Sequence, residues 1–148
     1  MTLETMPLSK ALNSGLRRAM EDDSRVLLMG EDIGKLGGVF RVTEHLQRDF
    51  GDKRVLDTPL AESGIVGTAI GLAMTGFRPV IEIQFDGFVF PAFDQITTQL
   101  AKLTNRHEGK LSLPIVIRIP YGGHIGAVEH HQELSLIHIS EPTRRYAI

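Results

Sequence analysis

One carboxylate in this sequence, Glu62, stands immediately before an uncharged stretch that runs from Ser63 to Phe77. An acid in the first turn of a helix is favoured by the helix dipole, and such a side chain is commonly solvated. Alternatively, Glu62 enters an apolar crevice, where desolvation makes a carboxyl group harder to ionise. In that setting a carboxyl group can donate a proton or hold a hydrogen bond during catalysis. Position alone leaves both interpretations open.

The stretch after Glu62 has the pattern of a helix with two distinct stripes. Three glycines, Gly64, Gly67 and Gly71, form one of them. A glycine inside a helix costs roughly 0.5–1 kcal/mol relative to alanine, and close approach of another backbone is the usual compensation. We therefore expect this helix to be packed on most sides, in a core or at an interface. The other stripe is apolar and comprises Ile65, Val66, Ala69, Ile70, Ala73 and Met74.

Helical and strand patterns alternate along the chain. Apolar residues at helical spacing predict helices over residues 8–19, 43–50, 58–75 (opened by a Thr-Pro turn) and 91–103. Short apolar runs predict strands over residues 26–29, 54–57, 79–83 and 115–119. This alternation predicts an α/β fold in which a parallel sheet is covered by helices on both faces.

Composition limits the function classes. The chain has 148 residues, which is enough for one domain with its own core. A net charge of −2 gives no electrostatic case for binding nucleic acid or an anionic membrane. The absence of cysteine excludes a disulfide scaffold, thiolate-bound zinc and a cysteine nucleophile. Residues 1–10 do not have the pattern of a signal peptide, so we expect a cytoplasmic protein.

Five motifs follow one another in a fixed order: GED at 30–32, GVFRVT at 38–43, GDKRVLDTPLAESGIVGTAIG at 51–71, RPVIEIQF at 78–85 and FPAFDQI at 90–96. Over about residues 5–133 the chain resembles the beta subunit of the decarboxylating component of pyruvate and branched-chain 2-oxo acid dehydrogenases. The resemblance implies a bacterial, transketolase-type pyrimidine-binding domain and thiamine diphosphate as the cofactor. The implied reaction is oxidative decarboxylation of a 2-oxo acid, with acyl transfer to lipoamide.

The resemblance also implies roles for individual residues. The glutamate that matches Glu62 hydrogen-bonds N1′ of the aminopyrimidine ring and so activates the cofactor, which carries the organic chemistry itself. Phe88 matches an aromatic residue that stacks on the pyrimidine, although a core phenylalanine is the simpler interpretation of any single Phe. Gln84, at the end of a strand, matches a pocket residue. Leu60 matches a position that lines the pyrimidine pocket through packing or its backbone.

The resemblance assigns an active-site histidine to His131, for proton transfer and reductive acylation of lipoamide. His130 is the adjacent alternative. The glycine-rich loop from Gly34 to Gly38 lacks both GxGxxG and GxxxxGK[ST] spacing. We expect that loop to be structural rather than a phosphate cradle.

One half of a thiamine diphosphate site is missing from this sequence. The family holds Mg²⁺ and the diphosphate with a GDG…N motif, and no GDG occurs here. We therefore expect no metal on this chain. The resemblance implies that an alpha subunit holds the Mg²⁺, in a heterotetramer of two alpha and two beta subunits. That heterotetramer would serve a lipoyl-bearing acyltransferase core.

The resemblance ends abruptly near the C-terminus. We expect residues 1–133 to be a truncated pyrimidine-binding domain. Residues 134–148 are expected to be a non-native tail, because their first eleven residues have the sequence of a translated sequencing adapter. Two rivals remain: another transketolase-like thiamine enzyme, and a catalytically silent or nonfunctional fragment.

Overall fold

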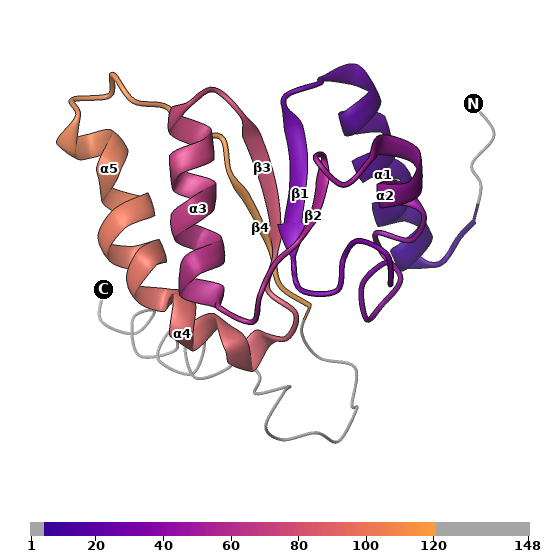
Figure 1. Ribbon diagram of the computed structural model, residues 1–148. Helices are drawn as coiled ribbons and strands as arrows, with labels where there is room; N and C mark the ends of the chain where they lie inside the picture. Colours follow the sequence, from indigo (N-terminus) through magenta and orange to yellow (C-terminus); the bar gives the residue numbers. More distant parts are fainter. Residues whose placement is uncertain (1–4, 121–148) are drawn as a thin grey trace, which may run out of the picture.

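A computed structural model describes residues 5–120 of the chain. Its centre is a parallel sheet of four strands in the order β2-β1-β3-β4 (Figure 1). The predicted parallel α/β architecture is therefore confirmed. The strands are β1 (Val26–Gly30), β2 (Val55–Asp57), β3 (Arg78–Glu82) and β4 (Val116–Arg118).

Helices cover both faces of the sheet, as the sequence predicts. One face carries α1 (Leu8–Asp22) and α2 (Leu46–Phe50), and the other carries α3 (Glu62–Met74) and the helices that follow β3 (Figure 1). Successive residues of β1 supply both cores, because side chains alternate across a strand. Leu27 and Met29 pack under α3, whereas Val26 and Leu28 pack under α1 and α2. None of the helices in the described part of the chain could span a membrane.

Gly30 permits the tight pairing of β1 with β3. In the register of these strands Gly30 lies opposite Glu82. A methyl group at Gly30 would lie 2.9 Å from the Glu82 carbonyl oxygen, which is closer than real side chains come to backbone. The carboxyl ends of the two central strands are therefore held side by side where the chain leaves the sheet.

Two helices begin later than the sequence predicts. The helix expected from residue 43 begins at Leu46, because Thr43 is tied to the preceding loop and His45 has a φ of 65°. The Thr43 hydroxyl donates to the Ile33 carbonyl at 2.7 Å. The helix expected to open at Thr58-Pro59 begins at Glu62 instead. The Thr58 amide continues the strand direction by donating to the Gly30 carbonyl at 3.0 Å.

The helix predicted over residues 91–103 is longer and is not a regular α-helix. It consists of a 3₁₀ turn (Asp86–Phe88), α4 (Val89–Asp94), a π-helical segment η2 (Gln95–Leu100) and α5 (Ala101–Arg106). The hydroxyls of Thr97 and Thr98 donate to carbonyls four residues earlier, at 2.9 and 2.6 Å. Such hydroxyls compete for the carbonyls of an α-helix and distort it.

Candidate active site at the carboxyl edge of the sheet

Glu62 is a buried carboxylate. It is the first residue of α3, and its side chain is only 5% exposed. At helical spacing it shares the buried stripe of α3 with Val66, Ala69 and Ala73, of which Val66 and Ala69 belong to the core under the sheet. The structure thereby decides between the two interpretations of the sequence, because a solvated acid at a helix start would be exposed. A catalytic role for Glu62 stays a prediction.

A second buried carboxylate, Glu31, accompanies Glu62. Glu31 directly follows β1, is 7% exposed, and its Oε1 atom is buried without a hydrogen-bond partner. Burial raises the pKa of Glu31, and the negative charges of Glu62 and Asp32 raise it further. The surroundings of Glu31 therefore make its carboxyl group harder to ionise. Glu31 is not among the site residues predicted from the sequence, although its position directly after a buried strand is a signal that could have identified it.

Gln84 lies at the same edge, two residues beyond the end of β3. It is half-buried, and its Nε2 donates to Oδ2 of Asp32 at 3.2 Å. Glu31, Asp32 and Gln84 are thus gathered where the two central strands end. Carboxyl ends of parallel strands are the usual ligand-binding edge of an open α/β sheet.

Phe88 belongs to a chain of aromatic rings. Its ring meets that of Phe85 edge to face, with centroids 5.7 Å apart, and Phe85 meets Phe40 in the same way at 6.0 Å. Phe88 is half-buried and packs at the margin of the core under α3. The core-residue interpretation accounts for these contacts, and stacking on a ligand stays a prediction.

Leu60 is 75% exposed in the segment that joins β2 to α3. An apolar hollow of about 300 Å³ lies beside this segment and the first two turns of α3. The hollow gives the start of α3 an open apolar flank next to the stripe that carries Glu62. Its lining residues are Met29, Leu56, Asp57, Thr58, Pro59, Ala61, Gly64, Ile65 and Thr68.

The loop from Gly34 to Gly38 uses its amides internally. Gly34 N–H donates to the Asp57 carboxylate at 2.6 Å, Gly37 to the Gly34 carbonyl at 3.1 Å, and Gly38 to the Asp32 carbonyl at 2.8 Å. These three N–H groups are therefore not available to cradle a phosphate. The loop is structural, as its sequence spacing predicts.

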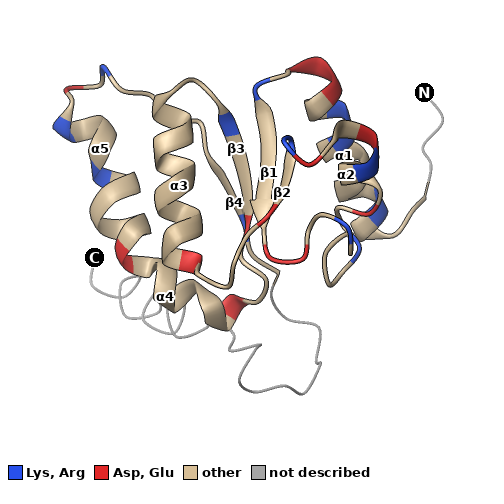
Figure 2. Cartoon of the chain, in the orientation of Figure 1, with Lys and Arg blue, Asp and Glu red and all other residues tan. Residues whose placement is uncertain are grey.

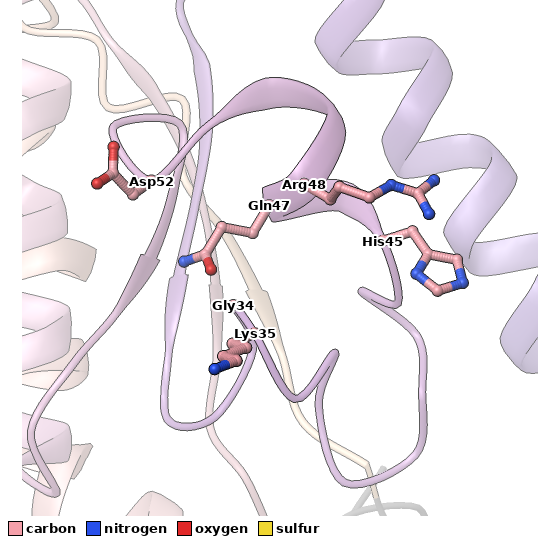
Figure 3. A pocket seen from close by; sticks show the side chains of 6 residues that line it. All are labelled: Gly34, Lys35, His45, Gln47, Arg48 and Asp52. Atoms are coloured by element: carbon pink, nitrogen blue, oxygen red, sulfur yellow. The ribbon is translucent and has the colours of Figure 1, made fainter.

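A larger hollow of about 400 Å³ lies near α2, and its lining includes Lys35, His45, Arg48 and Asp52. Figure 3 shows that these side chains do not converge: Arg48 and His45 extend to one side of the hollow and Asp52 lies on the other. Arg48 is in addition paired with Asp49 at 2.8 Å. This hollow therefore lacks the arrangement of a binding site.

The glycine stripe of α3 has few neighbours among residues 5–120. A methyl group at Gly71 would meet nothing within 4 Å, and one at Gly67 would meet only the Gln95 side chain, at 3.8 Å. A methyl group at Gly64 would meet only the Ala61 Cβ, at 3.6 Å. The expectation that α3 is packed on most sides is wrong for the described part of the chain. An interface with another chain remains as the explanation of the stripe.

The remaining predictions concern an active-site histidine, the C-terminal tail and metal binding. His131 and its alternative His130 lie outside the described residues, as does the predicted tail 134–148. Within residues 5–120, no cluster of three His, Cys, Asp or Glu residues could hold a metal ion.

Comparison with known proteins relates the site to named relatives. A "Pyruvate dehydrogenase E1 component subunit beta" of Leifsonia xyli subsp. xyli is 72% identical over 131 residues. A "3-methyl-2-oxobutanoate dehydrogenase subunit beta" of Mycobacterium tuberculosis is 53% identical over 130 residues. Both matches cover 88% of this chain, but only 39% and 37% of the respective relatives. The chain thus spans about two fifths of the length of these relatives.

The family model described as "Transketolase, pyrimidine binding domain" matches residues 4–138. That match covers the sheet, α3 with Glu62, and the Asp32–Gln84 edge. This chain belongs to the transketolase pyrimidine-binding domain family.

Proposed function

We propose that this chain is the cofactor-activating part of a beta subunit of a 2-oxo acid dehydrogenase. The observation that carries the proposal is the burial of Glu62 at the start of α3, beside Glu31 with its raised pKa. The names of the similar proteins support pyruvate or a branched-chain 2-oxo acid as the substrate. The reaction proposed is oxidative decarboxylation, followed by acyl transfer to lipoamide.

The residues at the carboxyl edge fit the pyrimidine half of thiamine diphosphate. The cofactor, when bound, supplies the electron sink for decarboxylation. Glu62 would hold a ring nitrogen through a hydrogen bond out of bulk water, and Gln84 would offer its amide. Phe88 and Leu60 would supply apolar contacts to the ring. The buried, unpartnered Oε1 of Glu31 shows that this edge has hydrogen-bonding capacity left over within the chain.

A partner must complete the cofactor site. The described residues hold no cluster for Mg²⁺, so we assign the metal and the diphosphate to an alpha subunit. The proposed assembly has two alpha and two beta subunits, bound to a lipoyl-bearing acyltransferase core. His131, preferred over His130, is proposed to act in proton transfer and acylation of lipoamide.

The exposed face of α3 and the residues around it are suited to contact with such a partner. Beyond Glu62, α3 carries no charged residue, and Figure 2 shows that Lys, Arg, Asp and Glu gather instead around α1 and α2. Large apolar side chains are exposed on this charge-poor side. A glycine stripe lets another backbone approach closely. These exposed apolar residues are Leu60, Met74, Phe77, Phe90 and Phe93.

The experiment is Glu62→Gln in a full-length beta subunit that carries this sequence, co-expressed with its alpha subunit. Glutamine keeps the size of the side chain but cannot exchange a proton. We expect decarboxylation to fall about 10²–10⁴-fold, the range for one positioned acid or base. Glu21→Gln, on the exposed side of α1, is the matched control and should leave the rate unchanged.

Three outcomes would contradict the proposal. Wild-type rates in Glu62→Gln would remove the proposed role of Glu62. Absence of 2-oxo acid decarboxylation by the intact wild-type pair, with sugar-phosphate transfer in its place, would favour the rival transketolase-like enzyme. A wild-type pair with neither activity would favour a silent subunit.

A further inference from the structure

We propose that Asp32 is a positioning residue, which orients the Gln84 amide so that its carbonyl oxygen is presented to a hydrogen-bond donor on a bound ligand. The inference rests on the proposed function, since Gln84 meets the cofactor only under that proposal. It concerns a contact between two loops that leave adjacent strands, and it assigns a role to Asp32, which the proposed function above does not use.

The register of the sheet creates this contact. Gly30 of β1 lies opposite Glu82 of β3, and the two strands run parallel. Asp32 and Gln84 each stand two residues beyond that pair, so the chains leave the sheet side by side. The Gln84 Nε2 reaches the Asp32 Oδ2 at 3.2 Å, across 52 residues of sequence.

The hydrogen-bonding properties of Asp32 determine the orientation of the Gln84 side-chain amide. An ionised carboxylate only accepts hydrogen bonds, so the Gln84 nitrogen, not its oxygen, must face Asp32. The amide oxygen is then directed away from Asp32 and remains as an acceptor. A ligand group with an N–H or O–H donor is favoured at that position, whereas a group that only accepts is disfavoured.

The backbone around Asp32 is fixed before any ligand binds. Asp32 has a φ of 57°, in the left-handed region that few non-glycine residues adopt. Its carbonyl accepts from the Gly38 amide at 2.8 Å, which closes the loop. Asp57 holds the same loop through the Gly34 amide at 2.6 Å. A side chain on a preorganised loop orients its partner at little further entropic cost.

The substitution Asp32→Asn tests the orientation of the Gln84 amide without changing the backbone conformation of the loop. Asparagine tolerates a positive φ, so the loop conformation is retained in Asp32→Asn. An asparagine side chain both donates and accepts, so either face of the Gln84 amide can meet it. The variant therefore removes the preference for one amide orientation and not the loop.

The first test follows the Gln84 side-chain amide by ¹⁵N NMR on this chain without cofactor. The Gln84 NH₂ signals are assigned from their loss in Gln84→Ala. We expect them to move in Asp32→Asn, which removes the carboxylate acceptor of the Gln84 Nε2, and to keep their wild-type positions in the exposed control Glu21→Gln. The amide of Gln99, which donates to the Thr98 hydroxyl at 3.5 Å, is the internal control. Glu31→Gln shows whether the other nearby carboxyl contributes.

Gln84 signals that stay at their wild-type positions in Asp32→Asn would overturn the proposal. Because no cofactor is present, this test is independent of the proposed function.

The second test measures the Kd of thiamine diphosphate for the intact alpha–beta complex by calorimetry. We expect Asp32→Asn to raise the Kd about tenfold, the loss expected for one hydrogen bond. In the Gln84→Ala background the same substitution should change the Kd less than about twofold, since Asp32 acts through Gln84.

An equal effect of Asp32→Asn in both backgrounds, or no effect in either, would overturn the inference. The proposed function is tested separately, by the decarboxylation rate of the Glu62→Gln variant. An inactive Glu62→Gln complex beside an Asp32→Asn complex with wild-type Kd would reject the inference alone.

Discussion

At the residue scale, two buried carboxyl groups lie together at the candidate site. Glu62 is placed by the start of α3 and Glu31 by the end of β1, and each is less than a tenth exposed. Burial raises the pKa of Glu31, and the nearby negative charges of Glu62 and Asp32 raise it further.

The raised pKa of Glu31 has a consequence for stability. The folded chain binds this proton more tightly than the unfolded chain, so stability falls as the pH rises from 4.5, the ordinary value, through the raised folded pKa. Above that window the wild-type chain bears the cost of a buried negative charge. Glu31→Gln removes that cost, and we expect the variant to be more stable than wild type at neutral pH but not at acidic pH.

Urea unfolding of both chains across this pH range measures the effect. The exposed Glu21→Gln variant is the control, and its stability should follow the wild-type curve. If the curves of Glu31→Gln and wild type are parallel at all pH values, Glu31 is not the group responsible.

At the element scale, Arg54 joins the first helix and strand to the start of β2. Its guanidinium donates to the carbonyls of Val26 at 2.7 Å, Met20 at 3.1 Å and Asp23 at 3.2 Å. It also lies 5.7 Å from the centre of the Phe50 ring. One side chain thereby satisfies carbonyls at the end of α1 and the beginning of β1, which supports the strand pairing that precedes the site.

We expect Arg54→Ala to lower the free energy of unfolding by roughly 2–4 kcal/mol, because three partly buried carbonyls lose their charged donor. Denaturant unfolding measures this loss. Arg18→Ala, which breaks only an exposed ion pair with Asp22, is the matched control and should cost less than about 0.5 kcal/mol. Equal losses in the two variants would show that the Arg54 network contributes no more than a surface ion pair.

At the scale of the whole molecule, charged residues are unevenly distributed. Many lie on α1 and α2, whereas α3 carries none beyond Glu62 (Figure 2). The α3 side also exposes a glycine stripe and large apolar residues. An apolar surface of this kind marks an interaction site in a soluble protein. The proposed alpha subunit would cover it.

Gly71→Ala tests this surface, because no residue in the described range 5–120 opposes a methyl group there. We expect the variant to stabilise the isolated chain by about 0.5–1 kcal/mol, through helix propensity, yet to weaken assembly with the alpha subunit. Denaturant unfolding of the isolated chain measures the change in stability. Analytical ultracentrifugation of the full-length alpha–beta pair measures assembly. Gly15→Ala, at an equally open site on α1, should bring a similar stability gain with normal assembly. Normal assembly in Gly71→Ala would exclude close packing at that position.

The sequence by itself determined the alternation of helices and strands along the chain, the parallel sheet and the presence of Glu62 near the start of a helix. These features follow from local periodicity, in which each residue is judged against neighbours a few positions away. The errors in the predicted helices arise where contacts outside this apolar pattern determine the structure. The later start of α2 depends on the Thr43–Ile33 hydrogen bond, and the π-helical segment depends on hydroxyl contacts that the apolar pattern does not show.

Only the tertiary structure decided which polar groups meet and which side chains leave water. The burial of Glu31 and the link between Asp32 and Gln84 depend on the pairing of Gly30 with Glu82. The openness of the glycine stripe depends on what packs around α3. Each of these features is set by strand register and by packing between distant segments, so local periodicity alone does not predict it. A one-residue shift in register would place every side chain of a strand on its other face.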